Sequence, residues 1–390
     1  MATPLEQLGA IGQSPWYDSI GRTFIKSGAL RALIDRDIRG VTVNPTIFEK
    51  ALAAGSDYDV SIGALVARGA RPYGIYESLL IEDITAAADL FRPTYERSAG
   101  QDGFVSIEVS PALAHDTAGT IAEARQFIGR IKRPNVLVKV PATDEGIPAI
   151  RQLIGEGIKV NITLIFAITS YERVMEAYLA GLEQLAARGR PLETMASVAS
   201  FFVSRVDTEV DQRLDSIIAA GVSDKRREEL EALRGKAAVA NARIAYQRFQ
   251  QTFAGERFQA LKQKGARVQR PLWASTGTKN PAYSDVKYVE ELIGPDTVNT
   301  MPLATLEAFQ DHGRVVRTID THLDDAYLTI NRLEDAGISM REVTNKLLMD
   351  GVQLFSDSIA RITRVIGEKS APLLAEHPEQ PTGLARAIAH

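Results

Sequence analysis

Short strand-like runs alternate with helix-like stretches through most of this 390-residue sequence. The strand-like runs are rich in β-branched residues, and the stretches between them repeat apolar residues at helical spacing. Such alternation is typical of a parallel sheet covered by helices, and eight strands favour closure into a (β/α)8 barrel. The predicted strands are 16–20, 40–44, 104–109, 136–140, 160–166, 196–203, 271–275 and 297–301.

This α/β pattern leaves a second architecture open, a doubly wound open sheet. That fold usually carries a glycine-rich phosphate-binding turn after its first strand, and the sequence has none there. We therefore predict one TIM-barrel domain over residues 1–366, with helical insertions at about 46–98 and 207–263. The C-terminal helices are expected to pack on the barrel, and 367–390, which contains three prolines, is expected to form an extended tail.

The composition excludes several kinds of site. The chain has no cysteine, so disulfides, zinc–thiolate sites, iron–sulfur clusters and thiol nucleophiles are ruled out. The five histidines are scattered without metal-ligand spacing, which argues against a metal site. The formal net charge of -4 gives no general attraction to nucleic acid or to an anionic membrane. Neither a secretion signal nor a run of about 20 apolar residues is present, so we expect a cytoplasmic protein.

Polar residues share one face of several predicted strands. Successive side chains on a strand point to opposite sides, so odd and even positions can be separated. In one strand, for example, Val105, Ile107 and Val109 form an aliphatic face, and Ser106 and Glu108 lie opposite. In a barrel such polar faces converge in the interior, near the carboxyl ends of the strands where active sites are built. The polar residues expected there are Asp18, Asn44, Glu108, Lys139, Asn161, Thr163 and Ser200.

Lys139 is the central candidate of this set. It stands between Val138 and Val140 on a strand that ends at Pro141. A buried ammonium group without a partner costs on the order of several kcal/mol, so burial favours the free amine. A neutral amine held in a fixed place is what a Schiff-base nucleophile needs. The alternative is a lysine at a strand end whose charged head reaches water.

Six segments carry a resemblance to a known family. They are Trp-Tyr-Asp-Ser-Ile at 16–20, Thr-Val-Asn-Pro-Thr at 42–46, Ser-Ile-Glu-Val at 106–109, Val-Lys-Val-Pro-Ala-Thr at 138–143, Val-Asn-Ile-Thr-Leu-Ile-Phe at 160–166 and Ser-Phe-Phe-Val-Ser-Arg-Val-Asp at 200–207. In this order they resemble the transaldolases of the long bacterial type. Those enzymes are (β/α)8 members of the class I Schiff-base aldolase superfamily and act in the pentose phosphate pathway.

The resemblance implies a role for each interior residue. Lys139 would form an imine with the substrate, and Asp18 would act as acid and base at the C4 hydroxyl of the donor. Glu108 would move protons through a water while the carbinolamine and the imine form. The residues that would hold substrate hydroxyls or that water are Asn44, Asn161 and Thr163.

The resemblance also implies a phosphate site at the mouth of the barrel. Ser200 and Arg205 would bind the phosphate, with Phe202 and Ser275 as further substrate-binding residues. The family's second phosphate-binding arginine follows the seventh strand, where this chain reads Ser-Thr-Gly-Thr-Lys-Asn from Ser275. Lys279 is therefore the candidate, although lysine supplies a point charge rather than a two-pronged fork. A solvated loop charge is the alternative for Lys279.

The expected reaction is the transfer of a dihydroxyacetone unit from a ketose phosphate to an aldose phosphate through a lysine Schiff base. It requires no organic cofactor and no metal. Phosphorylated sugars are the expected partners, and the chain is expected to be a monomer or a homodimer.

Two other functions remain open at this point. The closest is a fructose 6-phosphate aldolase, which releases free dihydroxyacetone. In that relative a glutamine replaces the glutamate and a tyrosine replaces the phenylalanine, so Glu108 and Phe202 favour transfer. The second is a non-catalytic protein that binds sugar phosphates. Such a protein is expected to lose the nucleophile or its base, and both Lys139 and Asp18 are present.

Overall fold

Eight parallel strands close into a barrel in the computed structural model of the protein, which describes residues 2–53 and 55–375. Each strand pairs with the next one in sequence, and the eighth strand returns to pair with the first. The predicted (β/α)8 barrel is therefore confirmed, and the open sheet is wrong. The strands are β1 (Gln13–Tyr17), β2 (Gly40–Val41), β3 (Phe104–Glu108), β4 (Val136–Pro141), β5 (Val160–Ile165), β6 (Ser197–Phe202), β7 (Arg270–Ala274) and β8 (Thr297–Met301).

Two strands differ from the prediction by more than one residue at a boundary. β1 pairs with β8 from Gln13 to Tyr17, so Asp18 follows the strand instead of lying inside it. β2 comprises only two residues, Gly40 and Val41. Residues 42–44 belong to no strand, and the next helix begins at Pro45. Both changes place polar residues on loops at the carboxyl end of the barrel.

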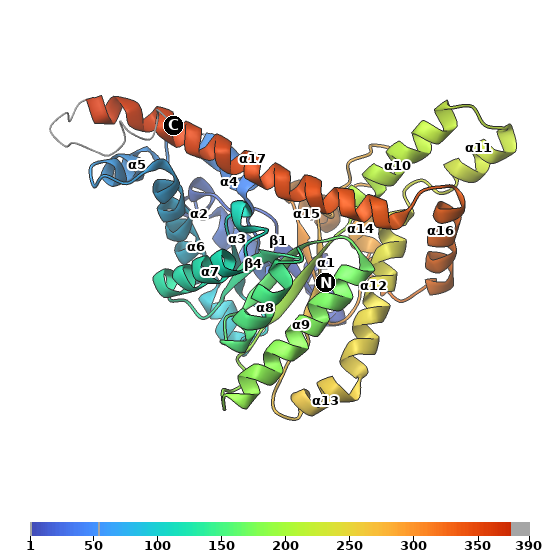
Figure 1. Cartoon of the computed structure of the whole chain (residues 1–390), viewed down its shortest axis with the longest axis horizontal. Helices are drawn as coiled ribbons and strands as arrows, with labels where there is room; N and C mark the ends of the chain where they lie inside the picture. The colour runs from blue at the N-terminus through green and yellow to red at the C-terminus, as the bar shows by residue number, and fades with distance from the viewer. Residues whose placement is uncertain (1, 54, 376–390) are drawn as a thin grey trace.

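Helices surround the barrel and extend beyond it (Figure 1). They are α1 (Pro4–Ile11), α2 (Arg22–Lys26), α3 (Ala29–Asp35), α4 (Pro45–Ala53), α5 (Asp59–Val66), α6 (Pro72–Arg97), the 3-10 turn η1 (Pro111–Leu113), α7 (Thr117–Ile131), α8 (Gly146–Gly155), α9 (Ile168–Ala187), α10 (Ser204–Ala219), α11 (Asp224–Glu231), α12 (Ala237–Ala254), α13 (Glu256–Lys262), α14 (Lys287–Glu290), α15 (Leu303–His312), α16 (Leu323–Asp335) and α17 (Met340–Ala375). The two regions expected to hold helical insertions contain α4 to α6, between β2 and β3, and α10 to α13, between β6 and β7.

The long helix α17 lies across one end of the molecule, from α16 to the neighbourhood of α5 (Figure 1). Ion pairs attach it to the first helices after β2, since Arg361 contacts Glu49 at 2.6 Å and Lys369 contacts Asp59 at 2.6 Å. The expectation that C-terminal helices pack on the barrel is therefore confirmed. The expected tail over 367–390 is wrong in its first part, because the helix continues through residue 375. The rest of that tail lies outside the described residues.

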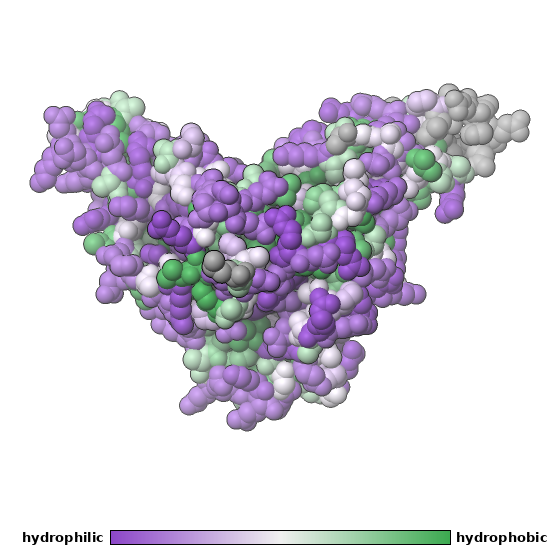
Figure 2. All heavy atoms as spheres, turned by 180° about the vertical axis from the view of Figure 1, so that it is seen from behind, coloured by the Kyte–Doolittle hydropathy of each residue, from purple (hydrophilic) through white to green (hydrophobic). Residues whose placement is uncertain are grey.

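Large apolar side chains fill the barrel near the beginnings of the strands. Trp16, Phe104 and Leu137 are buried there, and the rings of Trp16 and Phe104 have centroids 6.3 Å apart. The face shown in Figure 2 is largely hydrophilic with small, separate hydrophobic patches. Within residues 2–53 and 55–375, every helix is too short or too polar to span a membrane.

Candidate active site

Lys139 pairs with a carboxylate inside the barrel. The register of β3 and β4 sets Glu108 beside Lys139. The Oε2 atom of Glu108 lies 3.2 Å from Lys139 Nζ, and Nζ also donates a hydrogen bond of 3.0 Å to the carbonyl oxygen of Val43. Lys139 is only 4% exposed. The burial argument from the sequence treated this amine as unpaired, whereas the structure gives it an anionic partner and a backbone acceptor.

The Glu108 carboxyl is itself buried, and burial raises its pKa above the ordinary value. The positive charge of Lys139 opposes that effect. The contact of Lys139 with Oε2 of Glu108 is an ion pair without hydrogen-bond geometry, and no other described residue donates to that oxygen. The carboxyl therefore keeps an acceptor that a water or a substrate hydroxyl can use, and a raised pKa suits a group that must both accept and return protons near neutral pH.

Asp18 lies just beyond β1, where its backbone N–H donates to the Met301 carbonyl at 2.8 Å. Burial raises the pKa of its carboxyl. Two effects oppose burial: Thr42 donates a hydrogen bond of 2.7 Å to Oδ1, and the positive charges of Lys139 and Arg205 act on the carboxylate. Asp18, on the other side of the barrel from β4, thus belongs to the same charged cluster as Lys139.

Asn161 is oriented by two hydroxyl groups. The register of β4 and β5 sets it beside Lys139, and it is fully buried. Its amide nitrogen donates to Ser106 Oγ at 3.0 Å, and its Oδ1 accepts from Ser200 Oγ at 2.7 Å. Because both hydroxyls contact the amide, Asn161 is held in one orientation. The Ser200 hydroxyl, which the resemblance gives to a phosphate, is used on Asn161 in this structure.

Thr163 has a fully buried hydroxyl without a hydrogen-bond partner in the described part of the chain. Such an unsatisfied group costs roughly 1–3 kcal/mol unless a water or a ligand contacts it. The backbone is irregular at this point, because the pairing of β5 with β6 shifts register between Ile162 and Ile165. Leu164 has a φ of 57°, a left-handed conformation that is uncommon for leucine. Bulges of this kind redirect side chains next to active sites.

The candidate phosphate residues surround the mouth of the barrel. Arg205 lies in the first turn of α10, and its guanidinium carbon is 5.4 Å from the centroid of the Phe202 ring. Burial lowers the pKa of Arg205, whereas the negative charges of Asp18 and Glu108 oppose that effect. Its cation is therefore part of the same electrostatic cluster as the two carboxyls. The ring of Phe202 also packs against the ring of Phe166, with centroids 5.1 Å apart.

The other three predicted residues have different environments. Ser275 has a left-handed backbone, with φ of 56°, and its hydroxyl lies 3.0 Å from that of Ser204. Lys279 is exposed, and its charge contributes to lowering the pKa of Asp18. Asn44 accepts a hydrogen bond of 3.0 Å from the backbone N–H of Ile47, so its side-chain oxygen caps the first turn of α4.

The family model named Transaldolase/Fructose-6-phosphate aldolase matches residues 15–366 of the chain. The chain belongs to this family. A protein named Transaldolase from Thermobifida fusca is 50% identical over 360 residues, which is 92% of this chain and 96% of that protein. A Transaldolase 2 from Nostoc is 48% identical over 355 residues, or 90% and 93% of the two chains. A Transaldolase from Mycobacterium ulcerans is 49% identical over 357 residues, or 91% and 94%.

The predicted activity is confirmed by this membership: the chain is a transaldolase-type enzyme, a transferase of aldehyde or ketone residues. A Schiff base on a lysine and action on phosphorylated sugars follow from the family. No group of three or more side chains suited to hold a metal ion occurs in the part of the chain that the structure describes.

Sequence reasoning missed the hydroxyl groups that support this transaldolase site. Ser106 orients Asn161, and Thr42 contacts both Asp18 and, at 3.0 Å, the hydroxyl of Thr300. The parity of the strands already placed Ser106 on a polar face, but a serine on a strand more often bonds a nearby carbonyl. Only the register between strands identifies their partners.

Proposed function

We propose that the enzyme transfers a dihydroxyacetone unit from sedoheptulose 7-phosphate or fructose 6-phosphate to glyceraldehyde 3-phosphate or erythrose 4-phosphate. The observation that carries this proposal is the buried pair of Lys139 and Glu108, 3.2 Å apart, which shares its charged cluster with Asp18. A nucleophilic amine, a proton carrier beside it and a separate base are the three groups that this transfer needs.

Imine formation uses Lys139 and Glu108. Glu108 takes a proton from the ammonium group, and the free amine attacks the C2 carbonyl carbon of the ketose phosphate. The carbinolamine oxygen then leaves as water after it is protonated by Glu108, acting directly or through a water. Thr163, whose hydroxyl has no partner among the described residues, supports that water in this scheme.

Cleavage uses Asp18. It removes the proton of the C4 hydroxyl, and the C3–C4 bond breaks as the C4 oxygen becomes an aldehyde. The electron pair of that bond flows into the iminium group and leaves an enamine on Lys139. The aldose phosphate departs, with its phosphate drawn to Arg205. For transfer, the enamine carbon attacks the aldehyde carbon of the acceptor, the protonated Asp18 returns its proton to the new hydroxyl, and water hydrolyses the imine.

Binding of the donor uses the remaining residues. Asn44 and Asn161 hold donor hydroxyls. Phe202 presents its ring beside the Arg205 guanidinium, and Ser275 and Lys279 complete the phosphate site at the mouth. Ser200 acts mainly by holding Asn161 in this arrangement, which its hydrogen bond of 2.7 Å supports. We also propose a cytoplasmic monomer or homodimer, to be checked by cell fractionation and light scattering.

Trapping on Lys139 tests the proposal. The protein is incubated with fructose 6-phosphate and reduced with borohydride, and the modified peptide is located by mass spectrometry. A parallel sample contains erythrose 4-phosphate and is assayed for sedoheptulose 7-phosphate. A three-carbon adduct on Lys139 together with the seven-carbon product is expected. No adduct would refute the nucleophile, and an adduct with free dihydroxyacetone but no transfer product would identify an aldolase.

A further inference from the structure

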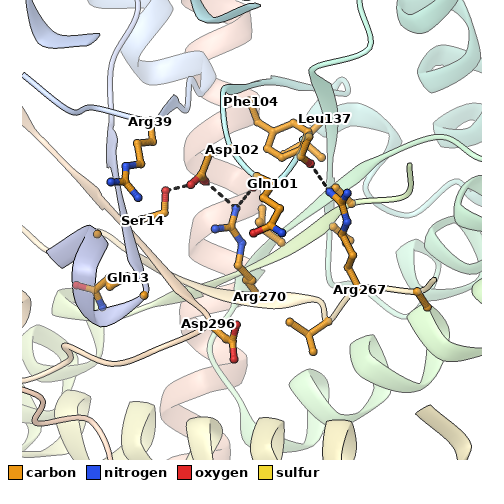
Figure 3. Close-up of a pocket in the computed structure, with 18 of the residues that line it drawn as sticks. Gln13, Ser14, Arg39, Gln101, Asp102, Phe104, Leu137, Arg267, Arg270 and Asp296 are labelled. Atoms are coloured by element: carbon orange, nitrogen blue, oxygen red, sulfur yellow. Dashed lines mark hydrogen bonds and ion pairs between the residues drawn. The ribbon is translucent and has the colours of Figure 1, made fainter. Parts of the chain in front are cut away.

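A second cavity, of about 470 Å³, opens at the end of the barrel where the strands begin (Figure 3). It is lined by the first residues of several strands, among them Ser14 of β1 and Arg270 of β7. Leu137 also lines it and precedes Lys139 by two positions on the same face of β4. The cavity therefore lies inside the barrel, at the end opposite the catalytic carboxyls, and the buried side chains of Leu137 and Phe104 line it.

Four cationic side chains line this cavity, against two carboxylates. The cations are Arg39, Lys262, Arg267 and Arg270, and the carboxylates are Asp102 and Asp296. Figure 3 shows the guanidinium groups of the three arginines on different sides of the space. Ligand cavities in proteins span roughly 300–1,000 Å³, so this one is large enough for a phosphorylated metabolite.

Some of these charges have an evident structural use. Arg270 contacts Asp102 at 3.0 Å and also donates to the carbonyl of Gln101 at 2.7 Å, which joins β7 to the loop before β3. Arg39 forms an ion pair with Asp37 at 2.8 Å. These ion pairs give two of the four cations, Arg39 and Arg270, a structural role.

Arg267 and Lys262 are not explained in this way. Arg267 donates to two neutral carbonyls, those of Gly100 and Ala99, each at 2.7 Å. In the described part of the chain neither Arg267 nor Lys262 has a carboxylate within ion-pair distance. Burial, with the nearby charge of Arg267, lowers the pKa of Lys159 to about 8. The positive charge of Arg267 thus also acts on Lys159.

The charges in the cavity match an anionic ligand. Four cations face two carboxylates there, and two of those cations have no carboxylate partner in the described part of the chain. A small molecule that carries a phosphate group would supply the missing negative charge.

We propose that this cavity is a second anion site, remote from Lys139, which binds the phosphate group of a small metabolite. The phosphate lies against Lys262 and Arg267, where Arg267 keeps its place through its two carbonyl contacts. Free phosphate and a sugar phosphate share the recognised group.

Trp16 supplies a built-in reporter for this site. Its indole N–H donates to Ser14 Oγ at 3.0 Å, Ser14 donates to Asp102 at 2.7 Å, and Asp102 contacts Arg270. An anion in the cavity changes the field along this chain and therefore the emission of Trp16. The sequence contains two tryptophans, so Trp273→Phe leaves Trp16 as the single emitter.

The test is a fluorescence titration of the Trp273→Phe protein, at constant ionic strength, with inorganic phosphate and with glucose 6-phosphate, an aldose that offers Lys139 no C2 ketone. A saturable change in emission is expected with both. Lys262→Glu, at an exposed position, is expected to weaken binding about tenfold or more, because it replaces an attractive contact with a like charge. Lys262→Arg is the matched control and is expected to bind like the parent.

Arg205→Ala separates this site from the catalytic one, since it removes the phosphate contact at the mouth and leaves the second cavity intact. Calorimetry of the Arg205→Ala protein, with both tryptophans present, repeats the measurement without the fluorescence reporter. Retained binding that Lys262→Glu abolishes supports the proposal. Absence of binding to Arg205→Ala, or binding that Lys262→Glu leaves unchanged, would overturn the proposal. The cations would then have a structural role only.

Discussion

Thr42→Val tests the role of Asp18 through a single hydrogen bond. Thr42 donates to Asp18 Oδ1 at 2.7 Å, and this bond opposes the rise in pKa that burial imposes on the carboxyl. Valine has nearly the shape of threonine but cannot donate. In the variant the pKa of Asp18 therefore rises further, and a larger fraction of the carboxyl is protonated at any given acidic pH. A protonated Asp18 cannot accept the C4 hydroxyl proton.

The magnitude follows from the strength of that bond. A hydrogen bond to a charged group contributes about 1.5–3 kcal/mol, and about 1.4 kcal/mol corresponds to a factor of ten in an equilibrium. On the acid side of the pH profile, we expect kcat/KM for transfer to fall about tenfold or more below that of the parent enzyme. Toward higher pH, once Asp18 is ionised in both proteins, we expect the two values to converge.

The assay is the initial rate of transfer from fructose 6-phosphate to erythrose 4-phosphate, measured across acidic and neutral pH. Thr300→Val is the matched control. It removes the 3.0 Å contact between the hydroxyls of Thr42 and Thr300 but leaves the bond from Thr42 to Asp18. Its profile should follow the parent. If the Thr42→Val profile superimposes on the parent, or moves toward lower pH, Asp18 is not the group whose ionisation limits the reaction.

Three further substitutions test the remaining roles. Lys139→Ala is expected to abolish the borohydride adduct while circular dichroism shows an intact fold; residual transfer by a folded variant would contradict the Schiff base. Glu108→Gln is expected to slow imine formation by about 10²–10⁴-fold, the range of general acid–base catalysis, in single-turnover trapping, with the adduct still on Lys139; an unchanged trapping rate would exclude Glu108 from proton transfer. Arg205→Ala is expected to raise KM for fructose 6-phosphate with little effect on unphosphorylated fructose, and equal losses with both ketoses would argue against a phosphate contact.

The sequence predicts the barrel because the evidence for it is local. Each strand is marked by its own β-branched residues and each helix by its own spacing, and closure follows from the number of units. The last strand is predicted at its observed bounds, Thr297–Met301. The first strand is misplaced, because its ends are set by pairing with β8, which lies far away in sequence. The sequence of a strand carries no local sign of its register with a strand that lies far away in the chain.

The same distinction applies to the site. Strand parity assigns Glu108, Lys139 and Asn161 to the interior without any knowledge of the fold. It does not reveal that Glu108 lies beside Lys139, or that the hydroxyls of Ser106 and Ser200 hold Asn161 from two sides. Those facts depend on which residues face each other across a ladder. Parity also assumes a regular strand, and the register of β5 shifts between Ile162 and Ile165, a stretch that contains Thr163.

That irregularity connects the catalytic end to α17. The left-handed backbone at Leu164 is accompanied by close contact with the helix, since a Cβ atom on Gly351 would lie 2.8 Å from a methyl carbon of Leu164. Only glycine lets α17 approach so closely. Asp350, the preceding residue, then brings a negative charge near the mouth, where it opposes the lowering by burial of the pKa of Arg205. The helix that ends the described chain thus acts on the proposed phosphate contact through charge as well as by covering the barrel.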